Sequence, residues 1–435
     1  MLAEFKLHIE NNFSFLKEHK FLIACSGGLD SVVLTHLLSK LDYSFELAHC
    51  NFNLRGKESK EDEQFVAQFA KSIGVKLHTV HFNTKKEINE RGGSTQMVAR
   101  DLRYEWFKEL LATKTCEYVL TAHHADDSLE TFIINLTRGT GLDGLTGIPQ
   151  INEKTVRPLL AFSRGNILAY AKANMLTWRE DSSNADTKYL RNEIRKEIIP
   201  KLKKLNQNVL SNFLNTQNNL KTSALILENT KKELQTKLFF KNGSNIKVSV
   251  KELLKLRPLE PYLYLLFKEY GFTAWNDVLG LLEANTGKEV RSRTHRLIKN
   301  REHLLLSPIL DKIDDEFYIF KDSGPIENPL QLSIKKVLEI SETNKNIVYM
   351  DMEKLNYPLM LRKWRKGDYF YPLGMAGKKK LSKYFKDEKV DIIAKEEQWL
   401  LCSNEQIAWV IGRRADERFK VTPDTKKIVK ITWHN

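Results

Sequence analysis

The chain has few cysteines and no long apolar run, and each absence excludes a class of protein. Cys25, Cys50, Cys116 and Cys402 are scattered, with no C-x-x-C spacing, so neither a disulfide framework nor a zinc or iron–sulfur site is indicated. No run approaches the roughly 20 apolar residues that a membrane helix needs, and the first ten residues lack the apolar core of a signal peptide. We therefore expect a protein of the cytoplasm with no membrane partner.

Length and charge indicate a soluble protein of several domains. Hydrophobic residues make up 42% of the 435 residues and charged residues 29%, and a chain of this length predicts roughly two to four domains. The net charge is +14, and residues 357–435 hold 18 Lys and Arg against 10 Asp and Glu. This local excess favours a polyanionic partner such as nucleic acid. Lysines that only keep a surface soluble are the alternative.

The most informative segment is SGGLDS at residues 26–31, between apolar runs at 21–25 and 32–38. This pattern predicts a strand, a tight turn and a helix. Such a turn can hold a phosphate on backbone N–H groups, a plain strand-to-helix turn being the alternative. A Walker loop is excluded because no lysine follows the glycines. The residues expected to bind a nucleotide here are Ser26, Gly27, Gly28, Leu29, Asp30 and Ser31.

Strand-like and helix-like runs alternate from residue 21 to about residue 160, which predicts an α/β fold with a doubly wound parallel sheet. Its ligand site is expected at the carboxyl ends of the strands. The strands are expected at residues 21–25, 45–50, 75–81 and 118–122, and helices at 59–73 and 95–113.

A polar helical stretch follows Pro200, and two smaller domains are expected after it, the first mainly helical and the second α+β or β-rich. The first should hold helices over residues 261–270 and 275–283. The expected boundaries are 1–205 for the nucleotide-binding domain, 206–245 for a helical linker, 246–310 for the first C-terminal domain, 311–350 for a connection and 351–435 for the last domain.

Acidic and histidine side chains follow the expected strand at 118–122 and open a helix. Asp127 and Glu130 are three residues apart, so both carboxylates project from one helix face and can share a cation or an ammonium group. The alternative for Asp127 and its neighbour Asp126 is helix capping. His123 is expected to orient a nucleotide, because the histidine spacing is not that of a metal-binding H-E-x-x-H helix.

Two pairs of arginines stand at helical spacing, and a further arginine precedes a glycine-rich loop. Arg100 and Arg103 are three residues apart, Arg191 and Arg195 are four apart, and Arg138 precedes a loop with four glycines between residues 139 and 147. A glycine-rich loop can wrap around a ligand, and arginine adds a charge that attracts phosphate. Exposed arginines on helices are also ordinary.

Cations alternate with aromatic residues in the basic C-terminal segment. This pattern offers phosphate contacts and base stacking. For Trp364, Phe370 and Phe385 the core of a small domain is the favoured place. The lysines expected to contact RNA are Lys378, Lys379, Lys380 and Lys383.

Taken in order, several segments resemble the tRNA(Ile)-lysidine synthetase family of the PP-loop ATP pyrophosphatases. The resemblance covers essentially the whole chain, is weaker over residues 246–307 and departs from the family pattern at Phe52, where a histidine is usual. The matching segments are SGGLDS at 26–31, ARDLRY at 99–104, AHHADDSLET at 122–131, RGTGLDGLTGI at 138–148, RPLL at 157–160 and LRNEIR at 190–195.

The resemblance implies a first domain of the adenine nucleotide α-hydrolase-like type and a ligation on RNA. ATP would adenylate the wobble cytidine, position 34, of the isoleucine tRNA with a CAU anticodon. Free L-lysine would then displace AMP at C2, giving lysidine, AMP and pyrophosphate and changing the identity of the tRNA from methionine to isoleucine. Mg²⁺ is implied, with Asp30 and Asp127 as ligands, while the metal count and a homodimer stay open.

Residue roles follow from the same resemblance. The expected catalytic residues are Asp30, Arg103, Asp127 and Glu130, and their division of labour is open. Arg138, Arg191 and Arg195 are expected to face tRNA phosphates. Two alternatives are another PP-loop enzyme that thiolates tRNA, which should carry cysteine pairs, and a non-catalytic tRNA-binding protein with a vestigial nucleotide pocket.

Overall fold

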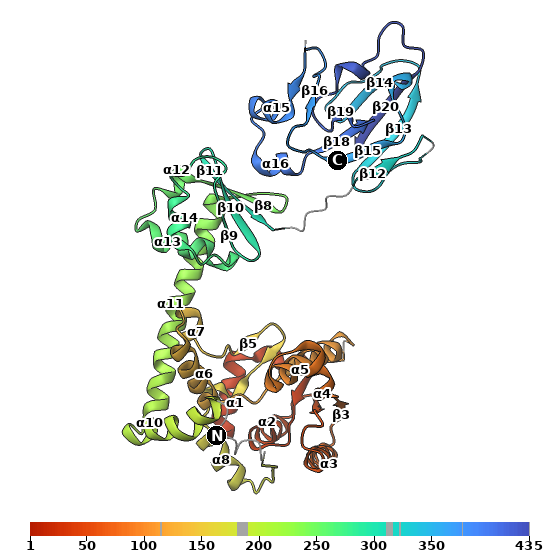
Figure 1. The fold of residues 1–435 in the computed structure, drawn as a ribbon. Helices are drawn as coiled ribbons and strands as arrows, with labels where there is room; N and C mark the ends of the chain where they lie inside the picture. The colour runs from red at the N-terminus through yellow and green to blue at the C-terminus, as the bar shows by residue number, and fades with distance from the viewer. Residues whose placement is uncertain (114, 181–189, 310–315, 322, 376, 435) are drawn as a thin grey trace. The chain divides into compact units, whose positions relative to one another are not determined.

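The computed structural model describes residues 1–113, 115–180, 190–309, 316–321, 323–375 and 377–434. The chain divides into two compact units, Met1–Asn229 and Thr230–Asn435, with the division inside a long helix (Figure 1). Within the described residues, no helix is both long enough and apolar enough to cross a membrane.

The first unit contains a six-stranded sheet in the order β3-β2-β1-β4-β6-β5. All neighbours are parallel except β5 and β6, which form a short antiparallel edge. The predicted doubly wound parallel sheet is therefore confirmed. Its strands are β1 (Phe21–Ala24), β2 (Phe45–Asn51), β3 (Leu77–His81), β4 (Tyr118–Leu120), β5 (Ile151–Asn152) and β6 (Thr155–Val156).

Helices cover both faces of this sheet because alternate strand residues point to opposite sides. Phe21 and Ile23 of β1 join a core with residues of α1, α2, α3 and α8, whereas Leu22 joins a smaller core with Phe107 and Leu111 of α5. These helices are α1 (Leu2–Asn12), α2 (Leu29–Lys40), α3 (Lys57–Ser72), α4 (Thr84–Arg91), α5 (Thr95–Ala112), α6 (Ala125–Arg138), α7 (Leu142–Leu145) and α8 (Arg164–Ala173).

A helical segment completes the first unit and leads into the second. It consists of α9 (Leu190–Glu193), a π-helical turn (Ile194–Ile198), α10 (Ile199–Leu205) and α11 (Val209–Leu238). Phe213 of α11 packs with Leu129 of α6 and with Ile194 and Ile199. The segment therefore lies along α6, and this packing places residues 191 and 195 beside the first turn of that helix.

The second unit begins with a domain that corrects one expectation. The expected helices are present as α13 (Leu259–Phe267) and α14 (Trp275–Gly280), with a short α12 (Val250–Leu253) before them. The domain is not mainly helical, however, because it also holds an antiparallel sheet in the order β7-β8-β11-β10-β9. Strand runs such as residues 295–308 can bury an apolar face only against the helices packed on them. The strands are β7 (Phe239–Asn242), β8 (Asn245–Ser249), β9 (Glu289–Arg291), β10 (His295–Asn300) and β11 (His303–Pro308).

The last part of the chain is rich in strands, as expected. Residues 311–315, the start of the expected connection, lie outside the described residues. Three sheets follow, in the orders β12-β15-β18-β19, β13-β20-β14 and β16-β17. Their elements are β12 (Phe317–Ile319), β13 (Gln331–Val337), β14 (Ile347–Asp351), β15 (Leu359–Lys363), β16 (Tyr369–Phe370), β17 (Lys379–Lys380), α15 (Leu381–Asp387), α16 (Ile392–Glu396), β18 (Trp399–Ser403), β19 (Gln406–Val410) and β20 (Ile428–His434).

Candidate active site

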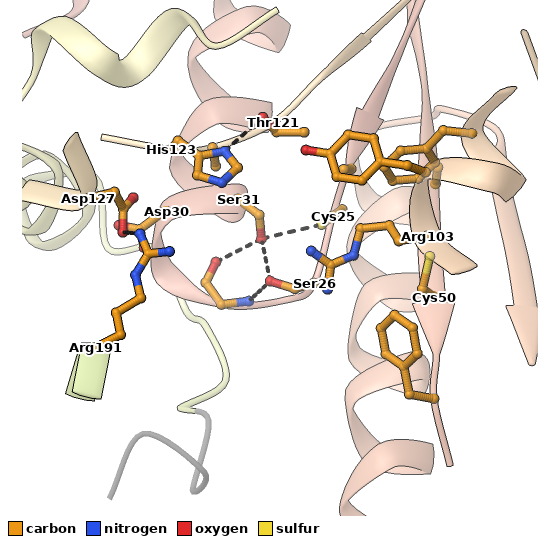
Figure 2. A pocket seen from close by; sticks show the side chains of 17 residues that line it. Cys25, Ser26, Asp30, Ser31, Cys50, Arg103, Thr121, His123, Asp127 and Arg191 are labelled. Carbon is orange, nitrogen blue, oxygen red and sulfur yellow. Dashed lines mark hydrogen bonds and ion pairs between the residues drawn. The ribbon is translucent and has the colours of Figure 1, made fainter. Parts of the chain in front are cut away.

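The candidate site lies where the sheet changes direction. Strand β1 has β2 on one side and β4 on the other, so the turns that follow β1 and β4 emerge side by side at the carboxyl edge. Both turns line a cavity of about 390 Å³, which we call the central cavity (Figure 2). The sheet topology thus brings together two motifs that are about a hundred residues apart in the sequence.

The glycine turn is held by its own hydroxyl groups. The Ser31 hydroxyl donates to the Gly28 carbonyl oxygen at 3.0 Å, and the Gly28 N–H donates to Ser26 Oγ at 3.3 Å. Gly27 has φ +84°, and a Cβ there would lie 3.2 Å from the side chains of Phe65 and Val66. Any other residue at Gly27 would therefore strain the turn and press on α3. Leu29 then begins α2, with its N-terminal N–H groups at the cavity.

Asp30 is a carboxylate without enough partners. Its Oδ1 is buried and has no hydrogen-bond partner among the described residues, and its Oδ2 lies 3.7 Å from His124 Nε2. Burial raises the pKa of Asp30, an effect that the neighbouring His124 only partly offsets. A buried carboxylate of this kind is better satisfied when a cation binds beside it.

The turn after β4 is locked into the start of α6. The His124 N–H donates to Asp127 Oδ2 at 3.0 Å, and the Asp127 N–H donates back to His124 Nδ1 at 3.4 Å, which forms a capping box. Asp126 accepts the backbone N–H of Arg164 at 2.8 Å and pairs with Lys203. Asp127 thus caps the start of α6, as the alternative expected, and Asp126 holds Arg164 and Lys203 in place.

Arg191 and Arg195 lie on the carboxylates of α6. The side chain of Glu130 is 1% exposed. Its Oε1 accepts a hydrogen bond from Arg195 Nε at 2.5 Å, and its Oε2 accepts one from Arg191 Nε at 2.8 Å. Arg195 Nη2 also lies 2.9 Å from Asp127 Oδ1, and Arg191 Nη2 lies 3.5 Å from the same oxygen. Figure 2 shows Arg191 beside Asp127 and Asp30. We expected the two arginines to face tRNA phosphates and the two carboxylates to hold an ammonium group. In the structure the arginines and the carboxylates pair with each other.

This network sets the protonation states in the site. Burial raises the pKa of Asp127, but His124, His123 and Arg191 together outweigh it, so its pKa is lowered. Burial lowers the pKa of His123 to about 4, and the ring bonds to the Thr121 hydroxyl through Nδ1 at 2.9 Å. At neutral pH the site thus combines ionised Asp127 with a neutral His123.

Arg103 and Phe52 form the opposite wall of the central cavity. The Arg103 guanidinium lies 5.4 Å from the centre of the Phe52 ring, and Phe52 stacks on Phe82 at 5.4 Å. Phe52, which stands where the family usually has histidine, thus supports an arginine through its ring face. Cys25 and Cys50 also line the cavity.

Arg138 is not brought to this site. It is the last residue of α6, whose first turn carries the acidic residues, and fourteen residues of helix span about 20 Å. The glycine-rich loop after it packs on the protein itself: a Cβ at Gly147, which has φ +74°, would overlap the Gln217 side chain of α11. Gln217 in turn donates to Ser128 Oγ at 3.0 Å.

The structure adds residues that the sequence patterns did not indicate. The backbone N–H of Arg179 donates to the Gly27 carbonyl oxygen at 2.9 Å, and its guanidinium pairs with Asp62 at 3.0 Å. Arg164 and Lys203 line a second cavity of about 710 Å³ on the other side of Asp30. No local spacing relates these residues to the glycine turn, so no sequence signal was available.

The C-terminal lysines form a cluster on the second unit. Lys378, Lys380 and Lys383 are exposed. Lys379 pairs with Asp387 at 2.8 Å. The neighbouring aromatic residues are core residues, as favoured from the sequence: Phe370 and Phe385 are fully buried, and Trp364 packs against them. The cluster therefore offers exposed positive charge beside a packed core.

No group of three or more His, Cys, Asp or Glu side chains is arranged to hold a metal ion within the described ranges. The residues nevertheless suit Mg²⁺, which binds through one or two carboxylates together with substrate phosphates and water. Asp30 Oδ1, buried and without a partner among the described residues, would be one such ligand, and Asp127 lines the same cavity.

Comparisons with known proteins cover every part of the chain. A family model for a PP-loop domain matches residues 1–202, one for a TilS substrate binding domain matches 241–309, and one for a TilS substrate C-terminal domain matches 359–433. A tRNA(Ile)-lysidine synthase of Parabacteroides distasonis is 38% identical over 443 residues, covering 100% of both chains. One of Bacteroides thetaiotaomicron is 38% identical over 97% of both chains.

Among solved structures, the U34-tRNA thiolase NcsA from Methanococcus maripaludis, with its [4Fe-4S] cluster, aligns with a TM-score of 0.42 at 19% identity. The alignment covers 50% of this chain and 79% of that chain.

Proposed function

This chain belongs to the tRNA(Ile)-lysidine synthase family of tRNA-modifying ligases, and we propose that it joins L-lysine to C2 of the wobble cytidine, position 34, of the isoleucine tRNA with a CAU anticodon. ATP first adenylates the cytosine O2 and releases pyrophosphate. The ε-amine of lysine then attacks C2 and AMP leaves, which forms lysidine.

One observation carries this proposal. The glycine turn after β1 and the acidic start of α6 after β4 line one cavity, together with Arg103 and Arg191. Backbone N–H groups of the turn and α2 suit the phosphates of ATP, and the arginines suit the charge that develops as the adenylate forms. His123, kept neutral by burial, lies within the same cavity as a hydrogen-bonding group for the nucleotide.

The position that we propose for the substrate lysine follows from which carboxylates of the site are not already paired with arginine. Both oxygens of Glu130 accept from guanidinium groups, and Asp127 Oδ1 accepts from Arg195. Asp30 has one ion-pair contact within 4.0 Å among the described residues, the 3.7 Å contact with His124, besides the longer-range attraction of Arg164 and Arg195. We therefore place the ε-ammonium of lysine near Asp30, with Asp127 and Glu130 acting mainly by holding the two arginines.

In the first step, before lysine reacts, Asp30 with Asp127 would hold Mg²⁺, which would supply positive charge to the leaving pyrophosphate.

The thiolation alternative is disfavoured by the state of the cysteines. Cys25 and Cys50 are the cysteines that line the central cavity. Burial raises the pKa of both, that of Cys50 to about 12, so neither is a thiolate at neutral pH. A sulfur-transfer enzyme needs a reactive thiolate or a metal cluster, and these residues offer neither.

A non-catalytic role is disfavoured by the free energy that the buried carboxylate of Asp30 costs the folded protein. Asp30 keeps a buried oxygen without a partner within the described residues, which a protein that only binds RNA has no physical reason to retain. The exposed Lys378, Lys380 and Lys383 supply the contacts to tRNA phosphates that either role requires.

The test is lysine incorporation with purified full-length protein, ATP, Mg²⁺ and labelled L-lysine. We expect label only in tRNA that carries a CAU anticodon with an unmodified wobble cytidine. The matched control is the same tRNA with uridine in place of that cytidine. Label in bulk tRNA with other anticodons, or no label in the CAU substrate, would contradict the assignment.

A further inference from the structure

A cavity of about 710 Å³ lies between α5 and the β4–β6 edge of the sheet, beside the central cavity. We call it the lateral cavity. Tyr104 and Phe107 line both cavities, so the two cavities are neighbours across these residues. Its charged lining residues are the cations Arg100, Lys108, Lys154 and Arg157 and the acids Asp101 and Glu153, so the wall carries a net charge of +2.

Arg157 is the unusual member of this wall. It is only 4% exposed, and its Nη1 donates to the Pro149 carbonyl oxygen at 2.8 Å. Its Nε is buried without a hydrogen-bond partner, and no carboxylate lies within 4.0 Å of its guanidinium in the part of the chain that the structure describes. A buried, unpaired guanidinium is unfavourable unless an anion binds to it.

The lateral cavity also offers an aromatic surface at its boundary with the central cavity. The Arg100 guanidinium lies 4.9 Å from the centre of the Tyr104 ring and steadies it. Single-stranded RNA is bound by this combination of aromatic rings for bases and cations for phosphates. A free phosphate would need the cations only.

We propose that the lateral cavity binds the nucleotide next to the wobble cytidine, with its phosphate on Arg157 and its base against Tyr104. The inference rests on the proposed function, because it requires the cytidine to react in the central cavity. The nucleotide next to a base in the central cavity is within reach of the lateral cavity, because Tyr104 and Phe107 line both cavities. Arg157 would thereby position the reacting base without touching it.

The test compares variants of the full-length protein for binding of a CAU anticodon stem-loop RNA. Arg157→Gln removes the buried charge, and the pair Arg100→Ala with Lys154→Ala removes two exposed cations whose loss does not threaten folding. Lys172→Ala, an exposed lysine at the end of α8 that lines neither cavity, is the matched control. Filter binding over a range of salt gives affinity and its salt slope, and the KM values for ATP and lysine are measured in parallel.

We expect Arg157→Gln to weaken RNA binding about tenfold and the exposed pair to reduce the salt slope by about 1, with the KM for ATP unchanged. A photoreactive base at either flanking nucleotide should crosslink to the peptide that contains Tyr104. The inference is overturned if both variants bind RNA like Lys172→Ala while the wild type forms lysidine. It is also overturned if Arg157→Gln weakens inhibition by inorganic pyrophosphate and leaves RNA binding unchanged, since the cavity would then take free phosphate.

Failure of the proposed function gives a different result, because the wild-type protein itself would then form no lysidine on the CAU substrate. If Arg157→Gln unfolds, the exposed pair and the crosslink still decide the question.

Discussion

Breaking the charge network of Glu130 with Arg191 and Arg195 should destabilise the first unit, and Glu130→Gln tests this. Glu130 is 1% exposed and accepts contacts at 2.5, 2.8 and 2.9 Å from the two guanidinium groups. Gln keeps the shape and one acceptor but turns an amide N–H₂ toward cationic donors. Removing one partner of a buried ion pair costs about 3–5 kcal/mol.

The partners are not fully buried, which reduces this cost. The side chains of Arg195 and Arg191 are 28% and 38% exposed, so water can solvate part of each charge after the substitution. We therefore expect a loss of about 2–3 kcal/mol, which for a unit of this size lowers its Tm by about 5–10 °C. High salt should change the difference little, because buried pairs are weakly screened.

Thermal unfolding of the full-length protein, followed by circular dichroism at low and high salt, measures this difference. Glu193→Gln is the matched control, because Glu193 is an exposed residue of the same helical segment and loses the same charge. A Tm for Glu130→Gln within about 1 °C of this control would refute the reasoning, since it would mean that the network adds nothing to the free energy of unfolding.

Three further predictions follow from the same geometry. Asp30→Asn should abolish ATP cleavage and leave tRNA affinity within twofold. It should also raise the Tm by a few degrees at neutral pH, because burial raises the pKa of this carboxylate and its charge therefore disfavours folding. A lower Tm together with lost RNA binding would make Asp30 a structural residue. The pKa of Asp127 is lowered in the folded protein, so the wild type should be more stable than Asp127→Asn at every pH above the unfolded-state pKa of about 4. This difference in the free energy of unfolding should disappear as the pH falls through the folded-state pKa, as measured by urea unfolding between neutral and acid pH. A difference that persists in acid would contradict this. Replacing Lys378, Lys380 and Lys383 by Ala should reduce the salt slope of tRNA binding by about 2–3, while ATP cleavage at saturating tRNA is unchanged. An unaltered slope would remove this cluster from the RNA interface.

Local sequence rules predicted the helices and strands of the first unit well, because each of them is specified by the pattern of apolar residues within its own segment. Apolar runs such as residues 21–25 and 45–50 form buried parallel strands, and the expected helix over 95–113 is α5 (Thr95–Ala112). The first C-terminal domain was less predictable. Its helices were expected, but its strands over residues 239–249 and 289–308 were not. β7–β8 and β10–β11 are local hairpins, whereas β8 pairs with β11 more than fifty residues away, and no local pattern reports that pairing.

The same contrast holds within the site. Helical spacing predicted that Asp127 and Glu130 share a face, and the glycine turn was expected to lie beside them at the sheet edge. Spacing did not indicate that Arg191 and Arg195 would bind those carboxylates, since more than sixty residues separate the partners. Arg138 stands at the far end of the same helix from the acidic residues, a separation that the rise of a helix already implies.

The sequence by itself determined the chemistry that is available: a phosphate-binding turn, paired carboxylates and a basic C-terminal segment, each written within a few neighbouring residues. Only the tertiary structure decided which charges are satisfied and which are left to a ligand. It paired Glu130 with two arginines, left Asp30 Oδ1 and Arg157 Nε buried without partners among the described residues, and set a second cavity behind Tyr104. The physical reason is that desolvation and pairing depend on what surrounds an atom in space, and chain neighbours make up only a small part of those surroundings.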